Sequence, residues 1–131
     1  LLPKFQEEVL RMSLSNNIIF LGEIDNPYPL IKKMDSYILP SRYEGFPNSL
    51  IEALSFGLPS IVSRCPGANE EIISDNFNGI TFKNENHEDL AKKIIMMKKN
   101  LKKFDSELIV QDIKNRYLIQ DIANQYKHLI V

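Results

Sequence analysis

Residues 37–62 read YILPSRYEGFPNSLIEALSFGLPSIV. Inside this stretch, residues 48–56 follow Pro47 and end before Gly57. A second proline, Pro59, comes two residues after this glycine. Proline at the start and glycine just past the end are typical of the two termini of a helix. An apolar run lies on either side of these residues. The stretch therefore predicts a strand, a helix and a second strand.

Short apolar runs recur along the chain, at residues 18–21, 37–39, 60–62 and 80–82. About 15 to 20 residues separate one run from the next, which is the spacing of β–α–β crossovers. The runs are almost wholly apolar, as expected when helices cover both faces of a sheet. We expect an α/β fold with a Rossmann-like parallel sheet flanked by helices, in which each of these strands is central.

Helical patterns account for most of the remaining chain. An amphipathic helix is expected within residues 1–15, a short one at 67–74 and a longer one at 88–101. The apolar spacing resumes at Glu107 and predicts a C-terminal helix, 107–131, that closes the domain. Residues 76–79, Asn-Phe-Asn-Gly, predict a turn.

Composition limits the class of protein. The 131 residues carry a net charge of −1, which fits a single globular domain and gives no electrostatic field to recruit nucleic acid. The one cysteine, Cys65, cannot form an internal disulfide, and two histidines with one thiol are too few for a structural zinc site. No window reaches the roughly 18 apolar residues of a membrane span. We expect a cytoplasmic protein with no nucleic-acid partner and no bound metal.

The turn at Gly45 has the chemistry of an anion site. In open α/β sheets, ligands bind at the carboxyl edge of the strands, and the first N–H groups of a helix attract phosphate. Glu44 and Glu52 flank the turn, and carboxylates are good acceptors for paired sugar hydroxyls. A nucleotide sugar combines a diphosphate with two polyols and fits this pattern.

A simpler interpretation exists for the same residues. Asn48, Glu52 and Ser55 follow one another at spacings of four and three, so they also fit the solvated face of an amphipathic helix. Glu44 would then be an exposed loop residue. Spacing alone leaves both interpretations open.

Other polar residues give weaker signals. Arg42 and Arg64 could reach a phosphate, but arginines at strand ends are more often solvated or paired. Cys65 lies near the ligand edge, where a small, partly buried thiol is the commoner outcome. His87 and His128 are expected to be exposed helix residues rather than catalytic bases.

The segment also carries a recognisable motif. The run EGFPNSLIEALSFGLPSIVS (44–63), preceded by YILPSRY (37–43) and followed by PGANEEIISDNFNGITF (66–82), resembles the donor-binding half of glycosyltransferase family 4. These are retaining enzymes of the GT-B fold. Two glutamates with seven residues between them, Glu44 and Glu52, are the family's signature, and NIIFLGEI (17–24) resembles the strand before its donor loop.

The resemblance assigns roles to individual residues. Glu44, the catalytic candidate, faces the hydroxyls of the donor sugar, and Glu52 accepts hydrogen bonds from the ribose. Gly22 lies near the nucleobase. The diphosphate lies along a short backbone segment made of Gly45, Phe46, Pro47, Asn48 and Ser49.

The resemblance also implies what the enzyme needs besides this chain. The family's donor domain begins with strands and cationic residues that are not found here, and it works with an N-terminal acceptor domain. On this basis the chain is a partial donor domain, 1–131, lacking its first strands and inactive alone. Its partners would be a nucleotide sugar and a glycan or lipid-linked acceptor. No Asp-x-Asp pair lies near Gly45, so the reaction is expected to need no metal.

Two other functions remain open at this level. One is a sugar-nucleotide epimerase or a glycan synthase of the same GT-B fold. The other, from a different class, is a non-catalytic α/β module that binds a ligand or a partner and would be indifferent to loss of the two glutamates.

Lysines are concentrated in residues 91–104, AKKIIMMKKNLKKF. Such a helix can rest on the anionic inner face of a membrane, which would make the protein peripheral there. The common alternative is an ordinary solvated helix face.

Overall fold

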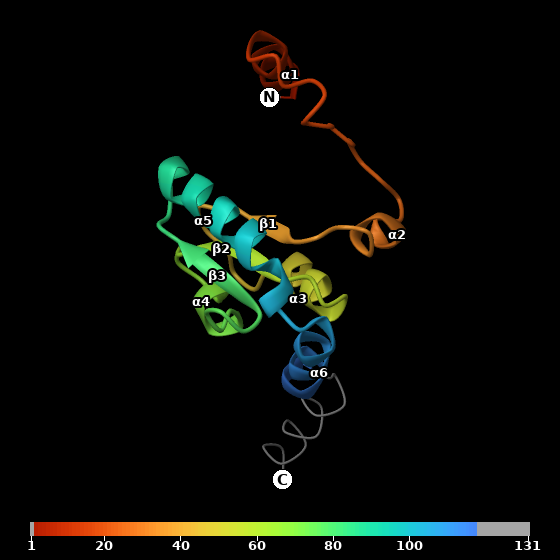
Figure 1. The fold of residues 1–131 in the computed structure, drawn as a ribbon, viewed down its shortest axis with the longest axis vertical. Helices are drawn as coiled ribbons and strands as arrows, with labels where there is room; N and C mark the ends of the chain where they lie inside the picture. The colour runs from red at the N-terminus through yellow and green to blue at the C-terminus, as the bar shows by residue number, and fades with distance from the viewer. Residues whose placement is uncertain (1, 118–131) are drawn as a thin grey trace.

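The computed structural model describes residues 2–117, and its centre is a three-stranded sheet (Figure 1). The strands are β1 (Tyr37–Leu39), β2 (Ser60–Ser63) and β3 (Gly79–Phe82). They are parallel and in the order β1-β2-β3, with Ile61 of β2 opposite Ile38 on one side and Ile80 on the other. The parallel α/β architecture expected from the apolar runs is confirmed.

The helices lie close to the predicted ranges. α3 (Asn48–Ser55) and α5 (His87–Asn100) each agree with the prediction to within one residue at either end. The predicted helix at 67–74 is shorter in the structure. The remaining helices are α1 (Leu2–Arg11), α2 (Tyr28–Ile31), α4 (Asn69–Ile72), the 3-10 turn η1 (Leu101–Lys103) and α6 (Ser106–Tyr117). α2 was not predicted, and the predicted continuation of α6 past residue 117 lies outside the described residues.

Helices cover both faces of the sheet. Successive residues of a strand point to opposite sides, so neighbouring residues of β2 pack against different helices. On one face, Ile61 of β2 packs with Met97 of α5. On the other face, Val62 packs with Leu54 of α3 and Ile109 of α6. All residues of β2 and β3 are buried, including the polar Ser60, Ser63 and Thr81, so neither strand has the exposed polar face that an alternating pattern would give.

The prediction of a strand at residues 18–21 is wrong. These residues have no regular structure and are exposed, Ile19 to 80%, and they belong to the segment that joins α1 to α2. In Figure 1 this segment and α1 stand away from the sheet. A strand needs a neighbour to accept and donate its backbone hydrogen bonds, and no described strand supplies one. Among the strands of residues 2–117, β1 and β3 are consequently the two edges of the sheet and only β2 is central, so the expectation that every strand is central also fails.

Candidate functional site

The loops that follow the three strands meet at the carboxyl edge of the sheet, because parallel strands end on the same side. The loop after β1 is hydrogen-bonded to the loop after β2 along its length. The buried Ser63 hydroxyl donates to the carbonyl of Ser41. The N–H of Glu44 donates to the Pro66 carbonyl at 3.1 Å. The Gly45 carbonyl accepts from the N–H of Ala68 at 3.3 Å.

The loop after β3 holds the same segment from the other side. The Asn84 side chain donates to the carbonyl of Arg42 at 3.1 Å, and the Arg42 guanidinium pairs with Glu85 at 2.9 Å. Residues 41–45 are therefore joined to both neighbouring loops, which fixes the backbone that carries Glu44.

Gly67 permits the close approach of two of these loops. Its φ of +127° lies in a region that side-chain-bearing residues rarely adopt. A Cβ at this position would also collide with the carbonyl oxygen of Glu44. Any residue larger than glycine would push the Glu44 segment away from the β2 loop.

Glu44 is half-buried, and its carboxylate is held by one neighbour. The Ser41 hydroxyl donates to Oε1 of Glu44 at 2.5 Å. Since an ionised carboxylate offers about four acceptor positions on two oxygens, Oε2 and part of Oε1 stay available to an incoming hydroxyl. The arrangement suits recognition of a polyol such as a sugar.

Backbone donors follow directly after Glu44. The N–H groups of Gly45, Phe46 and Ser49 have no acceptor within residues 2–117. The N–H groups of Asn48 and Leu50 are already used, each at 3.0 Å, by the carbonyls two and three residues earlier. Only some of the N–H groups at the start of this helix are therefore available to a ligand, and most of the available donors lie in the turn before it.

The surface at this turn is open. A Cβ on Gly45 would have nothing within 4 Å, so a ligand can approach the backbone closely there. Pro47 is buried, whereas Phe46 remains 53% exposed. The hydroxyl of Ser49 accepts a hydrogen bond from the Tyr37 phenol at 3.0 Å, which orients it beside the turn.

Glu52 lies one turn into α3 and is exposed together with Asn48 and Ser55. Within the described residues its carboxylate has no hydrogen bond or ion pair. This geometry leaves it able to bind a ligand, and it equally fits the solvated face considered from the sequence.

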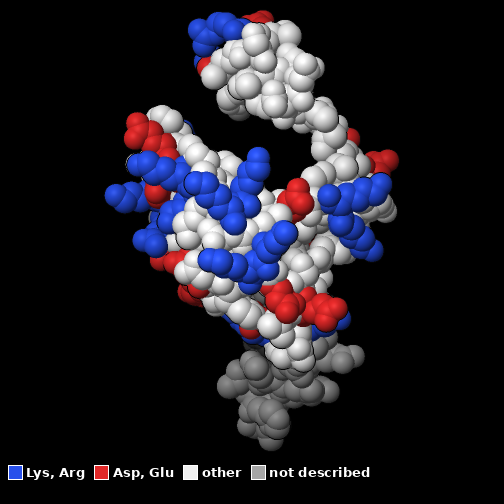
Figure 2. Space-filling view, viewed as in Figure 1, with Lys and Arg blue, Asp and Glu red and all other residues white. Residues whose placement is uncertain are grey.

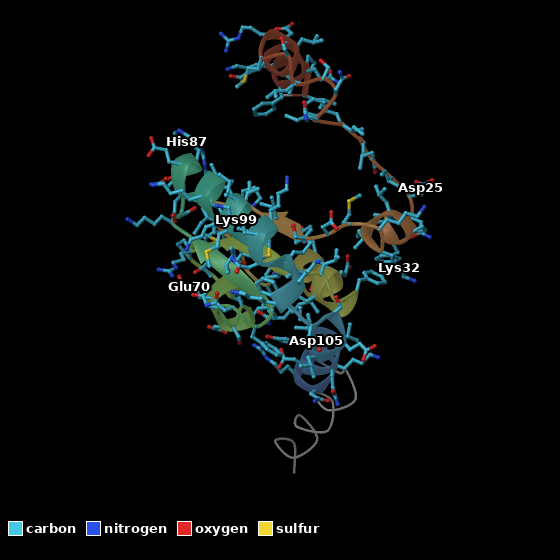
Figure 3. All side chains as sticks on the ribbon, viewed as in Figure 1. Asp25, Lys32, Glu70, His87, Lys99 and Asp105 are labelled. Atoms are coloured by element: carbon cyan, nitrogen blue, oxygen red, sulfur yellow. The ribbon has the colours of Figure 1, made fainter. Side chains whose placement is uncertain are left out.

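Gly22 is the one candidate that the structure places apart from the others. It has a φ of +67° and lies in the segment between α1 and α2, where nothing lies within 4 Å of a Cβ position. Figure 3 labels Asp25 in the same segment, well away from the sheet. The structure does not bring Gly22 next to the Glu44 turn.

The weaker candidates have structural partners. Arg42 pairs with Glu85, and Arg64 donates to the Thr81 hydroxyl at 2.8 Å and lies 3.9 Å from Asp75. The interpretation of both arginines as paired residues is confirmed.

The remaining weak candidates are Cys65, His87 and His128. Cys65 is buried and unpaired, and its Sγ lies 3.4 Å from the Asn69 amide. His87 is exposed at the start of α5, as expected. His128 lies outside the described residues.

Ser41, Ser63 and Gly67 were missed by the sequence analysis, although they position Glu44. Ser41 precedes Glu44 by three residues in a turn, a spacing at which a serine hydroxyl commonly bonds a nearby group. That spacing was a usable signal. The contacts of Ser63 and Gly67 join separate loops and have no local signature.

Residues 2–117 were compared with the requirements of a metal site and of a membrane span, and meet neither. In that part of the chain, no group of three or more His, Cys, Asp or Glu side chains is arranged to hold a metal ion. None of its helices combines the length and the apolarity that crossing a bilayer requires.

Comparison with known proteins identifies the family. The family model described as "Glycosyl transferases group 1" matches residues 2–114. A Campylobacter jejuni protein named N,N'-diacetylbacillosaminyl-diphospho-undecaprenol alpha-1,3-N-acetylgalactosaminyltransferase is 36% identical over 83 residues, which is 63% of this chain and 22% of that protein. The matched part is 16% to 22% of the length of the first three curated relatives.

Solved structures show the same fold. Anabaena HepE in complex with UDP superposes with a TM-score of 0.88 at 20% identity, over 98% of this chain and 36% of that one. The C-terminal domain of LpcC, a glycosyl transferase group 1 family protein from Francisella tularensis, superposes with a TM-score of 0.65 at 26% identity, over 86% of this chain and 56% of that one.

The sequence match and the superpositions agree with the resemblance seen in residues 37–82. The parallel sheet, its two helical layers and the loop edge are those of GT-B glycosyltransferases. The chain therefore belongs to the glycosyl transferases group 1 family.

Proposed function

We propose that this chain forms the donor-binding part of a retaining glycosyltransferase that moves a sugar from a nucleoside-diphosphate sugar to a glycan or lipid-linked acceptor. The observation that carries the proposal is the half-buried Glu44 carboxylate, held beside the free N–H groups of Gly45, Phe46 and Ser49. A carboxylate that can accept hydrogen bonds from hydroxyls thus lies next to N–H groups that can donate to an anion, on one fixed segment.

Each part of the donor has a matching group. The N–H groups of the turn and the positive end of the α3 dipole bind the diphosphate. Glu44 accepts from hydroxyls of the transferred sugar, and Glu52, one turn into α3, accepts from the ribose. The UDP in the Anabaena complex is the kind of ligand that this arrangement fits.

The reaction develops negative charge on the leaving diphosphate as the bond to the anomeric carbon breaks. Donors that already point at that charge stabilise it without reorganisation. In this chain those donors are backbone N–H groups. We propose that transfer needs no metal ion, with cations from the rest of the enzyme completing the site.

The acceptor of the transfer is suggested by a relative. The Campylobacter relative is named for a lipid-linked acceptor, a diphospho-undecaprenol. We propose that this enzyme takes a similar glycan or lipid-linked acceptor at the inner face of a membrane, with another domain binding it.

A lysine face on α5 and η1 supports contact with that membrane. Lys92, Ile95, Lys99 and Lys102 follow one another at helical spacing, and Ile95 is 56% exposed. No ion pair within residues 2–117 involves a lysine of this segment. Figure 2 shows the lysines gathered over α5, where Figure 3 labels Lys99. Unpaired lysines around an exposed apolar side chain are typical of helices that lie on anionic lipid.

Replacing Glu52 by Gln in the complete protein should weaken nucleoside diphosphate binding. The loss should be about 1 to 3 kcal/mol, the scale of a hydrogen bond to a charged group. Titration calorimetry with UDP and with GDP measures it. Glu107→Gln, which changes an exposed carboxylate on α6, is the matched control. An unchanged dissociation constant for Glu52→Gln would return this residue to the solvated face.

Replacing Glu44 by Gln should separate catalysis from nucleotide binding. Transfer should fall on the order of 100-fold, because the group acts on the sugar in the transition state. Binding of free UDP or GDP should stay unchanged, since neither ligand carries that sugar. The assay follows release of the nucleoside diphosphate from UDP-glucose, UDP-galactose, UDP-N-acetylgalactosamine and GDP-mannose. Full transfer activity of this variant would contradict the catalytic role of Glu44, whereas a protein that binds these nucleotide sugars but transfers none of them would fit a non-catalytic binding module.

Chelation tests the metal-free proposal. Activity of the complete enzyme should survive excess EDTA, because the described diphosphate donors are backbone N–H groups. Loss of activity that is restored by Mg²⁺ or Mn²⁺ would contradict it.

Charge reversal tests the lysine face. The protein should cosediment with phosphatidylcholine vesicles only when they also contain phosphatidylglycerol. Lys99→Glu and Lys102→Glu should each weaken this binding about fivefold or more, since each basic residue near an anionic surface contributes about 1 kcal/mol. Lys114→Glu, on α6, makes the same charge change elsewhere and should have little effect. Equal losses in all three variants would show a nonspecific response to charge.

A further inference from the structure

We propose that Ser41 is a positioning residue for catalysis, acting through the carboxylate of Glu44. The inference rests on the proposed function of Glu44 and goes beyond it by naming the group that orients it. The hydroxyl of Ser41 lies 2.5 Å from Oε1 of Glu44, and both residues are partly buried. Within residues 2–117, the Glu44 side chain makes no other hydrogen bond.

The bond has a directional effect. A carboxylate accepts and a hydroxyl donates, so Ser41 occupies acceptor capacity on Oε1 and leaves Oε2 to the ligand. Without this bond the Glu44 side chain is free to rotate about its side-chain torsions, because its exposed side offers no other partner in the described chain. Misplacement of a reacting group by about 1 Å is enough to reduce a rate about 100-fold.

The main chain of Ser41 is held separately from its side chain. Its carbonyl accepts from the hydroxyl of Ser63, which is fully buried at the end of β2. The following residues of the loop are hydrogen-bonded to the loops after β2 and β3. Removing the Ser41 hydroxyl therefore leaves the loop in place, and the expected defect is in the orientation of Glu44 rather than in folding.

Kinetics of Ser41→Ala test the proposal in the complete enzyme. With the UDP-sugar or GDP-sugar of the panel above that turns over, kcat should fall about tenfold or more. The dissociation constant of the free nucleoside diphosphate should change less than about twofold, because that ligand lacks the sugar. Ser41→Thr keeps a hydroxyl at the same place and should restore most of the rate. Ser55→Ala is the matched control, because it removes an exposed serine hydroxyl whose one hydrogen bond within residues 2–117 goes to the Ile51 carbonyl of its own helix.

A double-mutant cycle shows whether Ser41 acts through Glu44. In the Glu44→Gln background, Ser41→Ala should lower kcat by less than about twofold, since residues that share one interaction are not additive. Fully additive losses would overturn the proposal, and so would an unchanged kcat for Ser41→Ala alone.

The positioning role of Ser41 and the proposed function fail in different experiments. If Glu44→Gln impairs transfer and Ser41→Ala does not, only the positioning role is wrong. If Glu44→Gln leaves transfer unchanged, the catalytic role of Glu44 is wrong and the role of Ser41 with it. If no nucleotide sugar of the panel binds, the proposed function itself is wrong.

Discussion

Burial of β2 on both faces is the constraint on which the rest of the structure depends. Its four residues are inaccessible to solvent, with a strand on either side and a helical layer above and below. A strand in this position must satisfy its backbone groups within the sheet and pack side chains on both faces, as Ile61 and Val62 do on opposite sides. Once β2 is placed in this way, α5 must cover one face, α3 and α6 the other, and the loops after the strands must share one edge. The candidate site is located by that geometry.

The part of the fold that could be predicted is the part whose signals are local. Pro47 and Gly57 mark the ends of α3, and the apolar runs of β1, β2 and β3 are continuous in sequence. Residues 18–21 have an equally apolar run, yet they form no strand. The pairing partner of a strand is supplied by another segment, and the composition of the run itself does not encode its presence. α2, with four residues, is too short to give a period.

In the candidate site, too, only the features with a local signal could be predicted. The turn at Gly45 and the two glutamates could be identified from their spacing and from the resemblance to a family. Glu44 is held by the Ser41 hydroxyl, by a backbone hydrogen bond to Pro66 and by its close approach to Gly67, and the last two join residues more than 20 positions apart. No periodic pattern reports such contacts. The position of Gly22 relative to the turn likewise depends on how a separate segment packs, and its assignment to the nucleobase stays a prediction.

The connections of residues 41–45 to both neighbouring loops also limit how this site can change. The backbone on each side of Glu44 has a fixed partner, and Gly67 leaves no space behind it. An insertion or deletion here would break several of these bonds at once, whereas a substitution at the exposed Tyr43 or Phe46 would break none of them. A change of substrate preference in this domain is therefore accessible by exchange of side chains on a loop of constant length, and transplanting a loop of different length is a poor route to it.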